Sequence, residues 1–346
     1  MNTTSLDTAR LIQRVLLILG LTTLFVAVFL ALWYLPDVFL ILLAGILLTV
    51  FFDGLADVLV RHTDLSGGSA LTWVLLAFFL LSLGVLWLLG PVLSDGFQQL
   101  GQGIWSGATH LENWLKQYDL GQNLLQGLQD NLLTPARLQR LIGIFSTALG
   151  TLTTLFFILI LGIYLCLEPE TYIKGTLRLF PPANRAHAHA LLRELGQTLR
   201  WWLVGRIASM LVVGVLTGLG LLLVGIPSAL ALAVLAALLT FIPNLGPILS
   251  ALPAVLLGLA QSHWLALSVA LLYLIVQTVE SYFITPLIQR RVVAMPPALL
   301  LAVQLLLGVT VGMLGLLMSG PLTVIVMGVV QRLYLEDLLE APAAKS

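Results

Sequence analysis

Long apolar stretches, each close to the length that crosses a lipid bilayer, constrain this chain more than any other feature. A helix that crosses about 30 Å of hydrocarbon needs roughly 20 apolar residues. Stretches of this kind lie at residues 11–34, 38–60, 71–93, 144–167 and 201–224. The run after Val15 is too long for a signal peptide, so we expect it to be the first membrane span. The sequence therefore predicts an all-α, polytopic membrane protein.

The balance of apolar and charged residues points the same way. Hydrophobic residues make up 59% of the 346 residues and charged residues only 9%, whereas soluble domains carry about 25% charged residues. A soluble fold of this composition would expose large apolar patches, which favour aggregation. We therefore expect lipid to be the solvent for most of the surface. The formal net charge is zero, so charge gives no indication of a nucleic acid partner.

Basic residues outside the apolar stretches predict the orientation, because cytoplasmic loops of membrane proteins are enriched in Lys and Arg. They lie before the first span, after the second, and around the segment that follows the fourth: Arg10, Arg14, Arg61, Lys174, Arg178, Arg185, Arg193, Arg200 and Arg206. Four complete crossings place all three groups on one side. We expect a bacterial inner-membrane protein with both termini in the cytoplasm.

The segment between the third and fourth spans, residues 94–143, differs from its surroundings. It is richer in Gln, Asn, Gly and charge, and its apolar residues recur at intervals of three and four, as at Phe97, Leu100 and Ile104. That spacing predicts amphipathic helix. We expect a small helical cap on the extracytoplasmic surface or, alternatively, a gating or partner-binding element.

An apolar stretch at residues 228–260 is interrupted at its centre by the sequence FIPNLGP, residues 241–247. Pro243, Gly246 and Pro247 stop a helix, because proline lacks a backbone donor and glycine is flexible. Irregular backbone at membrane depth is tolerated only where protein buries it or it lines a watery cavity, and such breaks are typical of transport sites. We expect the freed backbone groups and the Asn244 amide to coordinate a polar substrate or an ion. The alternative is a tight turn between two tilted helices at the membrane surface.

The next predicted span, residues 263–288, carries Gln277 and Glu280 on one helix face. A carboxylate inside a span is costly and by default indicates a functional site. Three roles are open for Glu280: proton carrier, ligand of a cation, or structural partner of a nearby arginine.

The last apolar stretch, residues 298–333, is too long for one crossing, because about 36 residues of helix reach about 54 Å. Gly308, Gly312, Gly315 and Gly320, the last followed by Pro321, supply break points. We expect a second hairpin with Gly312, Gly315 and Gly320 as gating glycines. The two hairpins are expected to enter from opposite faces and to bring the number of membrane segments to about eight.

These features divide the chain into five parts. Residues 1–93 form a scaffold of membrane spans, followed by the 94–143 insertion. Residues 144–200 hold the fourth span and the basic cytoplasmic segment, and residues 201–334 form a transport region with the broken hairpins. Residues 335–346 are expected to be a cytoplasmic tail.

Sequence motifs for enzymatic chemistry are absent. The chain has no phosphate-binding G-x-x-x-x-G-K-[ST], no H-E-x-x-H and no G-x-S-x-G. The single cysteine, Cys166, forms neither an intramolecular disulfide nor a zinc site, so we expect a small buried hydrophobe. Asp53 and Asp57, four residues apart, either line a pathway or face the headgroups. We expect no cofactor, no metal and no enzymatic activity.

Motifs in the C-terminal half carry a likeness to a known family: FIPNLGP at 241–247, Pro253, Gln277, Glu280, ITPLI at 284–288, Pro296, Pro297 and the glycines between 312 and 321. These residues resemble the autoinducer-2 exporter (AI-2E) family of membrane proteins, and the order of spans, insertion and basic segment also fits. The ITPLI motif adds Thr285 and Pro286 to the candidate substrate-binding residues. Two features depart from the family pattern: Gln289 is followed by two arginines where many members carry Gly-Arg, and the loop at 61–69 is less basic.

The resemblance implies a transporter without ATPase activity, embedded in lipid, with about eight spans and a homo-oligomeric assembly. Members are associated with export of autoinducer-2, and some with sodium/proton exchange, so the substrate does not follow from membership. Our leading expectation is a secondary transporter, ion-coupled through Glu280, that exports a small polar molecule such as autoinducer-2, with Asn244 and Gln277 near the substrate. The alternatives are a monovalent cation/proton antiporter and, from another class, a structural or interaction protein acting through residues 94–139.

Overall fold

The structure is a computed structural model that describes residues 19–20, 22–23, 30, 34–116, 148–284 and 295–332. The predictions for the first span, the distal part of the insertion, Thr285, Pro286 and the C-terminal tail lie wholly or mainly outside these residues. The elements are α2 (Pro36–His62), α3 (Gly67–Leu115), α6 (Ala148–Leu167), α7 (Pro169–Arg178), η1 (Pro182–Asn184), α8 (Arg185–Val224), α9 (Ala229–Leu239), α10 (Leu245–Gln261), α11 (His263–Val279), η2 (Glu280–Ile284), α13 (Pro297–Val311) and α14 (Met313–Val329).

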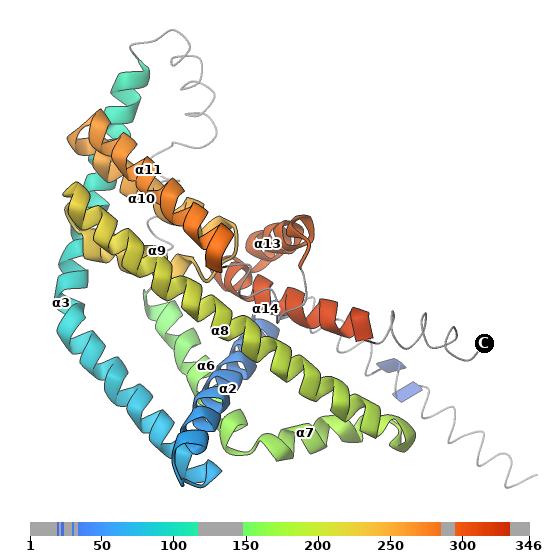
Figure 1. Cartoon of the computed structure of the whole chain (residues 1–346). Helices are drawn as coiled ribbons and strands as arrows, with labels where there is room; N and C mark the ends of the chain where they lie inside the picture. Colours follow the sequence, from blue (N-terminus) through green and yellow to red (C-terminus); the bar gives the residue numbers. More distant parts are fainter. Residues whose placement is uncertain are drawn as a thin grey trace, which may run out of the picture.

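The all-α prediction is confirmed, since the described residues contain helices and no strand (Figure 1). Among them, five helices are long and apolar enough to cross a membrane, and a sixth candidate is the pair α6–α7, bent by 85°. Helices α9, α10 and α13 are apolar but shorter, as expected for halves of broken segments. The described part of the chain therefore supports a polytopic membrane protein, without confirming the expected number of about eight segments.

Both predicted breaks are present, and two helices are longer than the spans predicted from the apolar stretches. Helix α3 continues through Pro91 to Leu115, so the third span and the described part of the insertion form one helix. Within this helix, Ser94 Oγ donates to the carbonyl of Pro91 at 2.8 Å. Helix α8 likewise joins the predicted basic helix to the fifth span. A change in polarity alone does not end a helix, and residues 183–226 contain no proline.

The long helices α3 and α8 run the length of the molecule and connect its two ends (Figure 1). At one end α2, α3 and α6 pack around Phe52, Ala70 and Cys166. At the other end α8, α9, α10 and α11 pack around Leu221, Leu232 and Val269. The hairpin α13–α14 packs between these groups, with α14 against α2 and α8.

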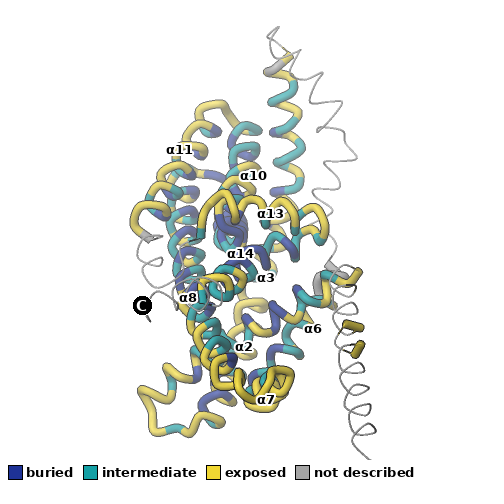
Figure 2. Tube along the Cα trace, turned by 90° about the vertical axis from the view of Figure 1, so that its right-hand side faces the viewer, coloured by how far each residue is buried: buried dark blue, intermediate teal, exposed yellow. Residues whose placement is uncertain are grey.

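Large apolar side chains cover the outside of the molecule, where Figure 2 shows exposed residues on most helices. Trp87 is 82% exposed, Leu223 89% and Val309 79%. Side chains of this kind on the outer faces of apolar helices require a nonpolar solvent. The surface therefore agrees with the expectation that lipid surrounds these helices.

Candidate functional site

The first break separates α9 from α10 by the turn of residues 240–244. Asn244 adopts a positive φ of 63°, one of two such non-glycine residues among those the structure describes. Gly246 packs so closely on the Leu239 carbonyl that a Cβ would overlap it. Pro243 and Gly246 are buried, whereas the Asn244 side chain is exposed. The FIPNLGP sequence therefore makes the turn at Pro243 and Asn244, and Gly246 and Pro247 lie in the first turn of α10, which begins at Leu245.

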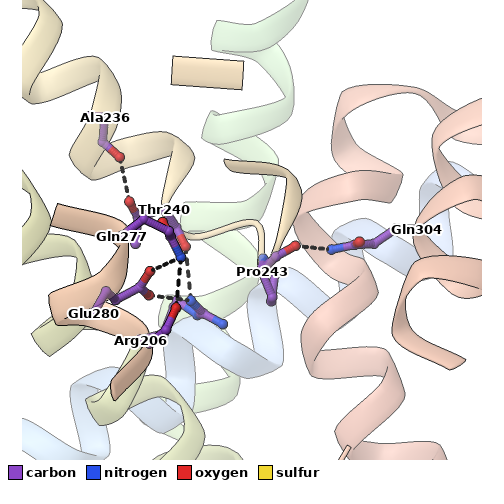
Figure 3. A network of polar contacts seen from close by, with 8 residues as sticks. Arg206, Ala236, Thr240, Pro243, Gln277, Glu280 and Gln304 are labelled. Atoms are coloured by element: carbon purple, nitrogen blue, oxygen red, sulfur yellow. Dashed lines mark hydrogen bonds and ion pairs between the residues drawn. The ribbon is translucent and has the colours of Figure 1, made fainter. Parts of the chain in front are cut away.

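A largely buried arginine holds one side of this break (Figure 3). Arg206, from α8, donates to the backbone carbonyl of Thr240 at 3.1 Å. That carbonyl belongs to the C-cap residue of α9, where helix carbonyls lack an intrahelical donor. The Arg206 guanidinium thus supplies a charged donor to backbone that the break has left without partners.

Glu280 is the counter-ion of this arginine. Glu280 Oε1 lies 3.7 Å from Arg206 Nη1, and the two side chains are only 7% and 15% exposed. Gln277 donates to Glu280 Oε2 at 3.0 Å and to Ser281 Oγ at 3.2 Å. Of the three roles considered for Glu280, the geometry shows a structural partner of arginine. Removing one member of such a pair leaves a buried charge uncompensated.

A glutamine from the second hairpin holds the other side of the break. Gln304, from α13, is fully buried and donates to the Pro243 carbonyl at 2.6 Å. In Figure 3 this contact lies on the side of the turn opposite Arg206 and Glu280. The Gln304 Oε1 atom has no hydrogen-bond partner within the described structure. The first break is therefore tied directly to the second hairpin.

The second break falls at Gly312, between α13 and α14. Its φ of 75° and ψ of −140° lie in a region that is essentially restricted to glycine. Gly315 packs on the Leu307 carbonyl, where a Cβ would overlap, and Gly320 packs on the Trp202 ring. Of the three predicted gating glycines, only Gly312 breaks the helix. Gly315 and Gly320 lie within α14 and allow it to pack closely on α13 and α8, and Pro321 follows inside the same helix.

Both breaks border one cavity of about 940 Å³ between α2, α6, α8 and the α13–α14 hairpin. Phe241, from the first turn, lines it, as do Val311 and Met313 on either side of Gly312. Phe241 also meets the Trp202 ring edge-on at 5.6 Å, and the Arg206 guanidinium lies 6.0 Å from the centre of that ring. Trp202 thus contacts both Phe241, which lines the cavity, and Arg206, which belongs to the ion pair.

The predicted site residues are only partly brought together. Gln277 and Glu280 are in contact, but neither these two nor Asn244 belongs to the described lining of the cavity. That Asn244 and Gln277 contact substrate remains a prediction. Thr285 and Pro286 lie outside the described residues.

Arg206 and Gln304 were not identified as site residues from the sequence. The sequence analysis counted Arg206 among the basic cytoplasmic residues and assigned no role to Gln304. A signal was available for both, because each is a polar residue inside an apolar stretch, and such residues generally face a partner or a polar path.

A second polar cluster joins α2, α6 and α8. Arg200 pairs with Asp57 at 2.5 Å and donates to the Gly54 carbonyl at 3.0 Å. The Cys166 thiol donates to Asp53 Oδ1 at 3.3 Å. Cys166 is buried, as predicted, but it has a polar partner. Because the Asp57 side chain is 55% exposed, this cluster differs from the enclosed pair around Glu280.

Comparison with known proteins gives consistent matches. The model of one family, described as AI-2E family transporter, matches residues 22–335. YueF of Bacillus subtilis (strain 168), named as a transport protein, is 26% identical over 204 residues, which is 59% of this chain and 54% of YueF. YrrI of the same organism, also named as a transport protein, is 27% identical over 162 residues, 47% of this chain and 46% of YrrI.

A third relative matches a shorter segment. YhhT of Escherichia coli (strain K12), again named as a transport protein, is 34% identical over 111 residues, or 32% of each chain. The aligned part of this chain spans about half the length of the two Bacillus relatives and a third of YhhT. These names give no substrate.

Proposed function

This chain belongs to the AI-2E family of transporters, and we propose that it is a secondary transporter whose moving part is the pair of broken hairpins α9–α10 and α13–α14. One observation carries the proposal: the two breaks border the same cavity, next to a buried ion pair. Breaks at membrane depth are typical of transport sites, and alternating access moves one such element against a scaffold.

In this scheme the substrate occupies the cavity and helices α2, α6 and α8 form the fixed wall. The Gln304–Pro243 hydrogen bond joins the two hairpins, so that a displacement of α13 acts on the first turn. Gly312 provides the pivot, because its backbone conformation excludes other residues and its neighbours pack through glycine. The contact between Trp202 and Phe241 connects the surroundings of the ion pair to the cavity wall, and in this scheme it changes when the first turn moves.

Ion coupling is proposed to act through Glu280. A proton on Glu280 removes the negative charge opposite Arg206 and leaves the guanidinium with the Thr240 carbonyl and the Trp202 ring but without a counter-ion. Because a buried charge without its partner is costly, protonation favours a rearrangement around the first turn. The coupling ion would thereby change the break that borders the substrate.

Further aspects of the proposal follow from the family and the sequence. We expect export of a small molecule, a homo-oligomeric assembly in the bacterial inner membrane, and both termini in the cytoplasm. The proposed activity is transport without catalysis. The polar substrate class and autoinducer-2 itself stay expectations, since the relatives' names give no substrate.

The test is solute flux in proteoliposomes under an imposed pH gradient, with candidate solutes including autoinducer-2. Glu280→Gln should abolish the pH dependence of flux. The matched control is Glu194→Gln, because Glu194 also pairs with an arginine at 3.7 Å but is 57% exposed; its flux should follow the wild type. Unchanged pH dependence in Glu280→Gln refutes the coupling role.

The same vesicles separate the alternatives. Sodium-driven proton movement without any solute, reported by a pH-sensitive dye, would identify a cation/proton antiporter. A cellular phenotype lost on deleting residues 94–139, with flux intact, would instead favour a structural or interaction role.

A further inference from the structure

The cavity follows one face of α2 along the helix. Its lining residues there are Asp37, Ile41, Ala44, Leu48 and Phe51, with Leu47 beside them. These positions recur at intervals of three and four, which is one stripe of a helix. The fourteen steps from the first of these residues to the last correspond to about 21 Å at 1.5 Å per residue. The cavity is therefore elongated and longer than one leaflet, which is about half of the 30 Å hydrocarbon core.

The polar side chains of the cavity gather at one end. Its described lining has only two polar side chains, Asp37 in the first turn of α2 and Thr154 of α6. Helices α2 and α6 run parallel, because Gly45 faces Leu161 while Asp53, eight residues later, accepts from the thiol of Cys166, five residues after Leu161. Thr154 precedes Leu161 by seven residues. It is therefore level with the first turn of α2, which precedes Gly45 by a similar number of residues. Asp37 and Thr154 lie at the same end.

The remaining walls are apolar. Leu203, Ile207 and Met210 line the cavity from α8, and Met313, Leu317 and Met318 from α14. A polar solute placed among them would lose its water without gaining hydrogen bonds, which is unfavourable. The thioethers of three methionines adapt readily to apolar shapes. These walls do not match the small polar molecule that the sequence led us to expect.

We propose that the cavity binds an amphipathic substrate, with an apolar body along α2 and a cationic or hydrogen-bond-donating head at Asp37. The proposal rests on the transport function proposed above and names the substrate class. A transported substrate accounts for the position of the cavity better than a static lipid does, because Phe241, Val311 and Met313 bring both breaks to its wall. The Asp37 carboxylate favours a cationic or hydrogen-bond-donating head, because no basic residue of the described lining neutralises it.

The test uses the full chain in phosphatidylcholine nanodiscs and three probes: octylamine, ethylamine and octanoate. A cysteine is introduced at the lining residue Ile41 (I41C), and its labelling by N-phenylmaleimide is followed with each probe present. Octylamine should protect it at concentrations at least about tenfold below ethylamine, because six more methylenes are buried. Octylamine should also act several-fold below octanoate. Asp37→Asn, added to I41C, should remove that preference for the amine.

Two controls accompany this experiment. The wild type, whose Cys166 is buried, gives the labelling background. Leu42→Cys is the matched control, because Leu42 is the next residue of α2, is 40% exposed and does not line the cavity. Equal protection at both positions would show simple partition into the bilayer and overturn the proposal. If ethylamine protects I41C as effectively as octylamine, the proposed apolar body of the substrate is overturned. If octanoate protects it as effectively as octylamine, the proposed cationic or hydrogen-bond-donating head is overturned.

Flux measured in parallel separates this proposal from the function on which it rests. No protection of I41C, together with solute flux that depends on Glu280, rejects the amphipathic site and leaves the transporter standing. Protection by octylamine in a protein that moves none of the three probes rejects a transport role for the cavity and identifies a static site for a lipid-like molecule.

Discussion

The two broken hairpins interrupt a helix by different physical means. The turn after α9 is held by side chains from other elements: Arg206 on the Thr240 carbonyl, with Glu280 behind it, and Gln304 on the Pro243 carbonyl. The turn after α13 is made by Gly312, and the close packing of Gly315 supports it without a charged side chain. The first break can respond to charge, whereas the second depends on backbone geometry.

This difference assigns separate tasks to the two hairpins. A break held by an ion pair changes when a proton arrives, so α9–α10 is suited to sensing the coupling ion. A break held by one glycine offers a pivot whose energy is independent of pH. Gln304 connects them, since it lies on the pivoting hairpin and holds the sensing one.

The largest loss of folding stability is expected when the charged side chain that holds the first break is removed. Arg206→Ala leaves the buried Glu280 carboxylate without its counter-ion and should lower the free energy of unfolding by about 3–5 kcal/mol. Thermal unfolding in detergent measures this. The control is Arg200→Ala, whose partner Asp57 is 55% exposed, and which should cost about 1 kcal/mol or less. Similar losses in both variants would remove the distinction between the enclosed pair and the exposed one.

A smaller loss of folding stability is expected at Gly312, the proposed pivot. Gly312→Ala places a Cβ on a backbone with φ of 75° and ψ of −140°, which should cost about 1–3 kcal/mol. The loss should be the same at acidic and neutral pH, since no ionisable group is involved. Gly84→Ala serves as the control, because Gly84 has open space around its Cα and lies within a helix. A pH-dependent loss in Gly312→Ala would break the proposed contrast.

The Gln304–Pro243 hydrogen bond, which links the two hairpins, should contribute less to folding stability. Gln304→Leu leaves the buried Pro243 carbonyl without a donor, at a cost of about 1–2 kcal/mol. The cost falls in the lower part of the usual range, because the substitution also removes Oε1, which lacks a partner in the described structure. Solute flux should fall further than this modest loss of folding stability would explain. Thr310→Val, on the same helix but with an exposed hydroxyl, is the control. Normal flux in Gln304→Leu would show that the hairpins move independently.

The smallest effect is expected at Asn244. Its side chain is exposed, and its positive φ suits glycine, so Asn244→Gly should change the free energy of unfolding by less than about 0.5 kcal/mol. Flux by this variant decides whether the side chain has a role of its own. Wild-type flux would assign Asn244 to the turn alone, and loss of flux at normal stability would restore it as a substrate ligand.

The breaks were predictable from the sequence because their cause is local. Pro243, Gly246 and Gly312 act on the backbone at their own positions, so the FIPNLGP motif and the glycine-rich stretch located both turns. Glu280 was identified for a similar reason, since a carboxylate in an apolar stretch is rare. Its role as arginine partner was one of the roles left open.

The contacts that define the site were not predictable in this way. Gln304 meets Pro243 across 61 residues, and Arg206 meets Thr240 across 34, so both depend on how the helices pack. The continuity of α3 through Pro91 was missed because a proline inside a long apolar helix can be accommodated by its surroundings. The cavity was not foreseen, although its residues form a regular stripe on α2.

The central claim is that protonation of Glu280 alters the cavity at which the two breaks meet. The most direct measurement is the rate at which a cysteine at Met313, beside Gly312 in the cavity wall, reacts with a membrane-impermeant maleimide added to one side of sealed vesicles. The rate constant, corrected for the pH dependence of a free thiol, should differ between about pH 4 and about pH 7, which lie on either side of the ordinary range for glutamate carboxyls. The account predicts that Glu280→Gln abolishes this difference. Equal corrected rates at both pH values, or a difference that persists in Glu280→Gln, would contradict it.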